Sequence, residues 1–364
     1  MKKFTWLLVT FMMIVALLLT SCEEKTDDKS ITTDTTTDKP VITETETDTS
    51  GTTKPTDDEQ QETTGPQYGG TLNMMQSGDI GGYDHAMYPQ GFLGNVFLVN
   101  DTLVVGDWTK GAAGTGEIDF SVGSLKRIEY TVGELAESFE VPDSETLIFH
   151  IRQGVYYSLD PNFEASRLVN GREMTRDDVV FSLNRHIQSP MSYLRITQPT
   201  MPDATTVTAE GDSAVVIKTT AFNMDALWLM IGEREIWPPE VIQTYGDVTE
   251  WQNQVGTGPF RMTDLVPGTS AIFKRNDNYW QKDTIGEGIG NQLPYLDGIR
   301  ILIISDTSSQ LAALRTGKID RLSGISHDDW SQLTKSSPEL RYQKNVSGPW
   351  AISMRQDNPA TPFS

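Results

Sequence analysis

The chain has 364 residues, and its 50 Asp and Glu against 29 Lys and Arg give a formal net charge of −21. Nucleic acids and anionic lipids bind basic surfaces, so this composition argues against both as partners. A single cysteine, Cys22, excludes an intramolecular disulfide. The four histidines are scattered without zinc-site spacing, and we expect no metal and no cofactor.

The N-terminus has the pattern of a bacterial signal peptide. Met1-Lys2-Lys3 carries positive charge, and residues 6–19 are almost wholly apolar. That run is shorter than the ~20 apolar residues of a membrane-spanning helix, but it suits a signal-peptide core. The following Leu19-Thr20-Ser21-Cys22 resembles a lipobox. We therefore predict a signal peptide over 1–21, acylation of Cys22, and an extracytoplasmic protein anchored by lipid to the cell membrane. The alternative is a plain secretory signal beside an incidental Cys22.

Residues 22–67 consist mainly of Thr, Asp, Glu, Ser and Pro. Such a segment buries too little apolar surface to offset its ordering entropy, so we expect a disordered tether after the acylated cysteine. A solvated tail with no role beyond its length is the alternative. From residue 68 onward apolar and aromatic residues reach ordinary density, and close to 300 residues remain, enough for more than one domain.

The body mixes strand and helix signals. Thr175, followed three residues later by Asp178, predicts a capped helix start. Pro267-Gly268 predicts a hairpin turn between two apolar runs. The irregular alternation indicates an α/β or α+β fold. In chain order we expect a strand at 71–75, a glycine-rich loop at 76–88, strands at 146–152 and 214–218, helices at 175–188, 224–231 and 238–245, a hairpin at 260–264 and 270–275, a strand at 299–304, and a helix from Asp306 to 314.

No set of residues indicates catalysis. The glycines at 286–290 are followed by Pro294 rather than by the helix that a dinucleotide loop requires. In a phosphate-binding P-loop, Lys and then Ser or Thr follow the last glycine, and the glycines at 256–258 are not followed by this pair. Asp177 and Asp178 are explained more simply by helix capping than by acid–base chemistry. We therefore do not expect an enzyme.

Eight sequence blocks resemble, in order and spacing, the family 5 extracellular solute-binding proteins of ABC importers, the peptide/nickel/oligopeptide-binding group. The blocks are YGGTL at 68–72, LAESFEV at 135–141, TLIFHIRQGV at 146–155, NGREMTRDDVVFSL at 170–183, VGTGPF at 255–260, RNDNYW at 275–280, LPYLDGI at 293–299 and LAALRTGKID at 311–320.

The resemblance implies an α/β fold of the type II periplasmic-binding-protein kind, with two lobes, a ligand cleft between them, and no catalysis. It places the first lobe at 68–305 and the start of the second lobe at 306–364. Members of the family run well beyond this length, so we expect a C-terminally truncated member that holds mostly the first lobe. The stretch at 158–168 lacks the family's usual element, and we expect a variant loop there.

The function implied is capture of peptides or related small solutes for import by a membrane ABC permease. The alternative is a truncated surface lipoprotein that acts as a scaffold or partner-binding domain. In the family the loop after the first strand borders the cleft, which points to Ser77, Gly78, Asp79, Tyr83 and Asp84 as ligand contacts. The other reading of this loop is an ordinary glycine-rich turn. Of the nearby tryptophans, we assign Trp237 to the ligand site and Trp228 to the core.

Overall fold

The computed structural model of this protein describes residues 65–81, 83–87, 94–111, 114–118, 128–220, 228 and 231–343. The chain divides into two compact units, Met1–Gln61 and Glu62–Ser364, and every described residue belongs to the second. The proposed signal peptide, Cys22, nearly all of the tether and most of the expected helix at 224–231 lie outside the described residues.

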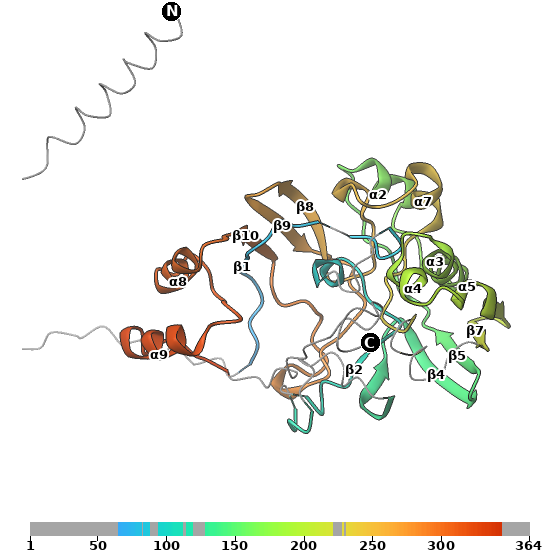
Figure 1. Ribbon diagram of the computed structural model, residues 1–364, viewed down its shortest axis with the longest axis horizontal. Coiled ribbons are helices and arrows are strands. Elements are labelled where there is room, and N and C mark those ends of the chain that lie inside the picture. The colour runs from blue at the N-terminus through green and yellow to red at the C-terminus, as the bar shows by residue number, and fades with distance from the viewer. Residues whose placement is uncertain are drawn as a thin grey trace, which may run out of the picture. The chain divides into compact units, whose positions relative to one another are not determined.

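Two four-stranded sheets form the framework of the second unit (Figure 1). Sheet I has the order β1-β10-β9-β8, and sheet II has the order β4-β5-β7-β6. A third, two-stranded sheet joins β2 and β3. The strands are β1 (Thr71–Gln76), β2 (Val104–Gly106), β3 (Thr131–Gly133), β4 (Ala136–Asp143), β5 (Thr146–Ile151), β6 (Thr205–Glu210), β7 (Ala214–Thr219), β8 (Phe260–Val266), β9 (Ser270–Arg275) and β10 (Gly298–Ile303).

Sheet I combines one parallel pair with two antiparallel pairs. β1 runs parallel to β10, with Thr71 opposite Gly298, whereas β9 is antiparallel to both β10 and β8. The turn at Pro267-Gly268 joins β8 to β9, and Gly268 has a φ of 67°, a left-handed value that favours glycine. The strands expected at 71–75 and 299–304 and the hairpin are therefore confirmed.

Sheet II is wholly antiparallel, and β5, one of its two central strands, contributes several side chains to the main core. Leu147, Phe149 and Ile151 alternate onto one face and are buried together with Leu183 and Ile187 of helix α3. The expected strands at 146–152 and 214–218 correspond to β5 and β7. Figure 1 shows α3, α4 and α5 beside this sheet, in agreement with the contacts of α3 and α5 with β6.

The helices among the described residues are short, and most lie between strands. They are α2 (Glu164–Val169), α3 (Arg176–Gln188), α4 (Tyr193–Thr197), α5 (Met201–Ala204), α7 (Pro239–Tyr245), α8 (Thr307–Arg315) and α9 (His327–Ser336), with 3-10 turns η1 (Gly94–Leu98), η3 (Ile128–Tyr130), η4 (Trp251–Asn253) and η5 (Gly286–Gly288). The predictions of α3, α7 and α8 are confirmed. The loop expected at 158–168 is wrong in its second half, where α2 forms and buries Ala165 and Val169.

Helix α3 begins as its sequence predicts. The Asp178 carboxylate accepts hydrogen bonds from the backbone N–H of Thr175 at 2.7 Å and from its hydroxyl at 3.1 Å. The same carboxylate receives two N–H groups of Arg172, at 2.8 and 2.7 Å, and Arg172 also binds Glu240 of α7. Asp178 is therefore a capping and cross-linking residue, which agrees with the structural interpretation of the Asp177-Asp178 pair.

Helix α8 packs on sheet I. Ala313 and Ile319 form a small buried cluster with Leu302 of β10. Asp320 extends the contact, because its carboxylate accepts the backbone N–H of Asn73 on β1 at 2.7 Å and its own N–H donates to the Asn73 carbonyl at 2.8 Å. The lobe boundary expected at 305/306 stays a prediction.

A close backbone contact joins the segment after η1 to the glycine block at 256–258. The N–H of Gly258 donates to the carbonyl of Val99 at 2.8 Å, and the Gly256 carbonyl accepts from the N–H of Ser158 at 2.8 Å. A Cβ added at Gly256 would lie 2.1 Å from the Val99 oxygen. These glycines are therefore required by backbone packing.

Gly256→Ala should lower the free energy of unfolding by about 2–3 kcal/mol, because the new methyl group must displace backbone. Chemical denaturation monitored by circular dichroism measures this change. Gly78→Ala is the matched control, because nothing lies within 4 Å of a Cβ at Gly78, and it should stay within about 0.5 kcal/mol of the parent. Equal stabilities of the two variants would contradict this packing.

Candidate functional site

The parallel strands β1 and β10 end at the same edge of sheet I, where Gln76 is opposite Ile303. The turn between β8 and β9 lies at this edge too, because Ser270 pairs with Leu302. In open α/β sheets, ligands bind outside the carboxyl ends of the strands. The segment that leaves β1 here is the candidate ligand-facing segment, and we call its described residues, 77–81 and 83–87, the β1 loop.

The first part of the β1 loop is exposed and held in place. Ser77, Gly78 and Asp79 are exposed, whereas Ile80 is buried against sheet I. Asp79 Oδ1 accepts the N–H groups of Ile80 at 2.8 Å and of Gly268 at 3.0 Å. The carboxylate thus joins the β1 loop to the β8–β9 turn. Three of the residues expected from sequence therefore form a fixed, accessible surface at the sheet edge.

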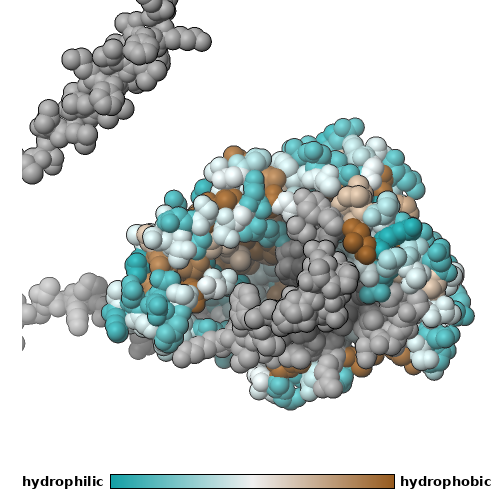
Figure 2. Space-filling model, in the orientation of Figure 1, coloured by the Kyte–Doolittle hydropathy of each residue, from teal (hydrophilic) through white to brown (hydrophobic). Residues whose placement is uncertain are grey.

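An apolar side chain is also exposed at this edge of sheet I. Val266, the last residue of β8, is 46% exposed. Figure 2 shows apolar atoms among hydrophilic ones on the sheet I side of the molecule. A surface that combines backbone groups, a carboxylate and apolar area suits a small amphiphilic ligand.

The second part of the β1 loop is buried. Tyr83 and Asp84 are 2% and 0% exposed, so their side chains are not accessible to a ligand in this conformation. The Tyr83 hydroxyl donates to Met262 Sδ at 3.9 Å. Burial, and to a smaller extent the charge of Asp79, raises the pKa of Tyr83 well above its usual value. Tyr83 therefore stays protonated and contributes packing here.

Asp84 is bound by an arginine of α3. Its two oxygens accept N–H groups of Arg185 at 2.7 and 2.6 Å, a two-point geometry that Arg and carboxylates favour. Asp84 also accepts the backbone N–H of Ala86 at 3.0 Å. The carboxylate is thus fully used within the chain. Arg185 was not singled out from the sequence, since nothing local links it to Asp84.

His85 forms a second buried pair. Glu235 accepts the His85 backbone N–H at 2.8 Å and lies 2.6 Å from its Nδ1. Burial by itself would raise the pKa of Glu235, but the neighbouring imidazoles of His186 and His85 and the hydrogen bonds from His85 lower it to about 2. The sequence analysis missed both residues of this pair. The only local signal was the charged run at 233–235 between two tryptophans.

His186 lies next to this pair without a hydrogen bond of its own. Its Nε2 is 3.7 Å from Glu235 Oε1, and neither ring nitrogen has a hydrogen-bond partner. Burial lowers the pKa of His186 to about 4, so the ring is neutral at pH 7. Interpreting His186 as structural agrees with its position on the buried face of α3.

Both tryptophans lie in the core. Trp228 packs against Phe139 and Phe149, at ring-centroid distances of 4.5 and 6.0 Å. Trp237 is 1% exposed, and its backbone exchanges two hydrogen bonds with Ser182 of α3. The structure therefore offers no accessible Trp237 surface, although the sequence analysis assigned this residue to the ligand site.

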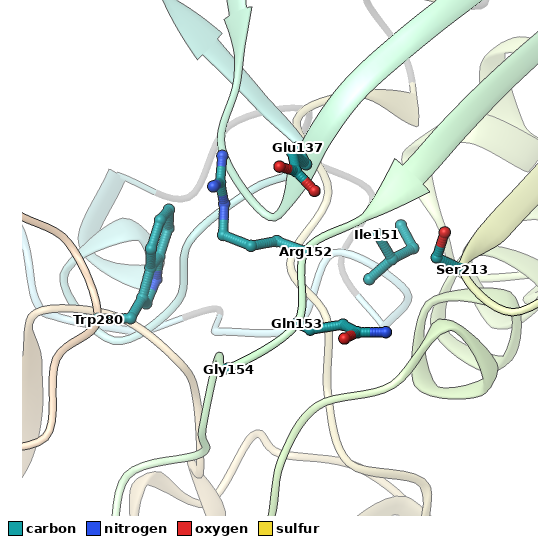
Figure 3. A pocket seen from close by; sticks show the side chains of 7 residues that line it. All are labelled: Glu137, Ile151, Arg152, Gln153, Gly154, Ser213 and Trp280. Carbon is teal, nitrogen blue, oxygen red and sulfur yellow. The ribbon is translucent and has the colours of Figure 1, made fainter.

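A shallow pocket of about 540 Å³ lies apart from the β1 loop, between sheet II and the segment after β9 (Figure 3). Arg152 stacks on Trp280, 4.8 Å from the ring centroid, and donates from Nε to the Glu134 carbonyl at 2.9 Å. Trp280 donates to the buried Asp101 at 2.8 Å. Burial and the charge of Glu134 raise the pKa of Asp101 well above its usual value. Arg152 is thus held by a backbone carbonyl and by the Trp280 ring, contacts within the chain that give it a structural role.

Among the described residues there is no group of three or more His, Cys, Asp and Glu arranged to hold a metal ion. Within the same part of the chain, no helix has the length and apolar character needed to cross a membrane.

The chain belongs to the bacterial extracellular solute-binding proteins, family 5, whose family model matches residues 131–364, more than half of its length. It is 27% identical over 239 residues to a probable ABC transporter-binding protein of Deinococcus radiodurans, covering 58% of this chain and 37% of that protein. It is 24% identical over 250 residues to the periplasmic oligopeptide-binding protein OppA of Haemophilus influenzae, covering 63% of this chain and 42% of that protein.

The fold agrees with the family. The periplasmic binding protein DppA of Helicobacter pylori, solved in complex with the peptide STSA, superposes with a TM-score of 0.56 at 22% identity, over 74% of this chain and 50% of that chain. The expected type II periplasmic-binding-protein fold is therefore confirmed over the residues that match. The chain spans half or less of the length of the relatives it matches.

Acid should destabilise the fold through His186. An unfolded histidine titrates near 6.5, whereas buried His186 titrates near 4, so the folded state binds fewer protons in this window. Stability is therefore lost as pH falls from 6.5 to 4, by up to about 3 kcal/mol from this group. Denaturation at pH 7 and 4.5 measures the loss, and His186→Gln should reduce it.

His150→Gln is the control, since this histidine is partly exposed on β5 and pairs with Glu140 at 2.8 Å. It should leave most of the acid sensitivity in place. A His186→Gln protein that loses as much stability as the parent would exclude His186 as the source.

Proposed function

We propose that this chain, which holds mostly the first lobe, belongs to a solute-binding lipoprotein that captures peptides or related small solutes and delivers them to a membrane ABC permease. The observation that carries the proposal is the position of the β1 loop. Its residues Ser77, Gly78 and Asp79 are exposed at the carboxyl edge of the parallel β1–β10 pair and are fixed by Asp79.

The relatives support the solute class. One matched relative is an oligopeptide-binding protein, and one matched structure holds a bound peptide. In the proposed mechanism, a second lobe closes over a ligand that lies against this edge, by bending at hinge segments. Burial of the ligand supplies most of the binding energy, and a few polar groups fix its orientation.

We assign the direct contacts to the accessible part of the loop. Gly78 leaves open space above the backbone, so a ligand can approach its peptide groups closely. Both backbone hydrogen bonds to the Asp79 carboxylate use its Oδ1, and the second oxygen, Oδ2, is suited to a cationic group such as an ammonium. Tyr83, Asp84 and Trp237, which we expected to touch ligand, are left out of this assignment, because their side chains are buried.

Ligand binding is tested with the protein in its full encoded length and an equimolar mixture of tripeptides as the probe. Native mass spectrometry should detect bound peptide, and the melting temperature should rise. Gly78→Trp should weaken binding about tenfold or more, because the indole fills the space of the ligand.

Val141→Trp is the matched control for bulk, because Val141 is 37% exposed on strand β4 of the other sheet. It should bind like the parent. If the parent binds no member of the mixture, the peptide class is wrong. If Gly78→Trp binds normally, the β1 loop is not the ligand surface.

The lipid anchor is a separate part of the proposal. It is supported by the Leu19-Thr20-Ser21-Cys22 sequence after a short apolar run and by the absence of any other cysteine. Acylation would hold the receptor at the membrane that contains its permease, and stable anchoring needs more than one acyl chain.

Cys22→Ser should move the protein from the membrane fraction to the soluble fraction of expressing bacteria, and it should abolish metabolic labelling by an alkyne palmitate analogue. A Thr20→Ser protein should behave as the parent. Retention of label in Cys22→Ser would show that the acyl group is attached elsewhere or that the signal is of another type.

A further inference from the structure

The buried half of the β1 loop is attached to the rest of the fold at several points. Arg185 of α3 holds Asp84 through two N–H groups, at 2.7 and 2.6 Å. Glu235 holds His85 through its backbone N–H at 2.8 Å and its ring nitrogen at 2.6 Å. The hydroxyl of Ser189 donates to the carbonyl of Ala86. We call the Asp84–Arg185 and His85–Glu235 pairs the clamp.

The clamp is unusual in its burial. Asp84 and Glu235 have no exposed side-chain surface, and His85 is 2% exposed. Buried ion pairs add little net stability compared with apolar packing, but they impose one geometry because an unpaired buried charge is costly. The Asp84–Arg185 ion pair and the two contacts of Glu235 with the adjacent His85 therefore restrict the path of the loop more than apolar packing would.

We propose that Arg185 and Glu235 are positioning residues that hold the β1 loop in its ligand-facing conformation, so that Ser77–Asp79 is formed before ligand arrives. This inference rests on the proposed function only in taking the loop as a ligand surface. A loop that is already ordered loses little entropy on binding, which increases affinity without adding a contact.

The environment of Glu235 adds a dependence on acid. Glu235 interacts with His85 from the loop, His186 from α3 and Arg234 from its own segment. His186 also faces Asp84, and Arg234 also faces Glu233 and Tyr193. His186 Nε2 lies 3.7 Å from the Glu235 oxygen that accepts the His85 N–H. A protonated His186 would compete for this oxygen and loosen the hold on His85.

Hydrogen–deuterium exchange on the full chain tests the clamp without any ligand. In Glu235→Gln, protection of the amides at 84–87 should fall about tenfold or more, while the amides of β5 keep their protection. Glu240→Gln is the control, since it also removes a paired carboxylate, but Glu240 pairs with Arg172 and not with a residue of the loop. In this control variant, the protection of the amides at 84–87 should change less than about twofold.

The pH dependence of amide protection distinguishes a positioning role in the β1 loop from a general contribution to the stability of the core. From pH 7 to 4.5, protection at 84–87 in the parent should decrease more than in β5, and His186→Gln should remove this difference. Unchanged protection at 84–87 in Glu235→Gln, or an equal loss over the whole chain, would overturn the proposal.

Should Glu235→Gln fail to fold, Arg185→Lys tests the other pair of the clamp, because a lysine ammonium cannot reproduce the two-point contact with Asp84. It should lower protection at 84–87 about threefold, and no change there would overturn the proposal. With the tripeptide mixture, clamp variants that bind as tightly as the parent would exclude a role in ligand affinity. A parent that binds no peptide would instead contradict the proposed function, while the exchange pattern would still decide the clamp.

Discussion

The contact between Val99 and the glycine block at 256–258 is the constraint on which the rest of the structure depends. Gly256 and Gly258 bring two backbones together where a Cβ would lie at 2.1 and 2.5 Å from Val99 atoms. The carbonyl of Gly258 also accepts from the Asn276 side chain at 3.0 Å, and the Gly256 carbonyl from Ser158. The start of β8, the end of β9 and the chain after β5 therefore meet at one point, which fixes sheet I relative to the loops of sheet II.

That fixed framework gives the β1 loop its two different halves. At the sheet edge the loop is anchored by Asp79, which leaves Ser77 and Gly78 accessible. Further along, the loop turns inward, and Asp84 and His85 become buried partners of α3 and of the segment at 231–237. A rigid scaffold that carries a short exposed loop is the usual arrangement of a binding surface.

The sequence was informative wherever a local signal decided the structure. Thr175 with Asp178 marked the start of α3, and Pro267-Gly268 marked the β8–β9 turn. The family blocks identified the fold correctly, although they could not distinguish which loop residues are accessible. The pairing of Asp84 with Arg185 joins residues 101 positions apart, and that of His85 with Glu235 joins residues 150 apart. Only the tertiary arrangement brings such groups together, and only the tertiary arrangement decides which side chains are buried. No local pattern indicated that Tyr83, Asp84 and Trp237, which we assigned to the ligand site, are buried.

The central claim is that the exposed part of the β1 loop forms the first-lobe wall of the ligand site. Photo-crosslinking with a tripeptide that carries a diazirine side chain, followed by peptide mapping of the full-length protein, tests it most directly. The account predicts label within residues 77–81 and its loss in the presence of excess unmodified tripeptide. Competable label confined to other parts of the first lobe, such as the Arg152–Trp280 pocket, would contradict it.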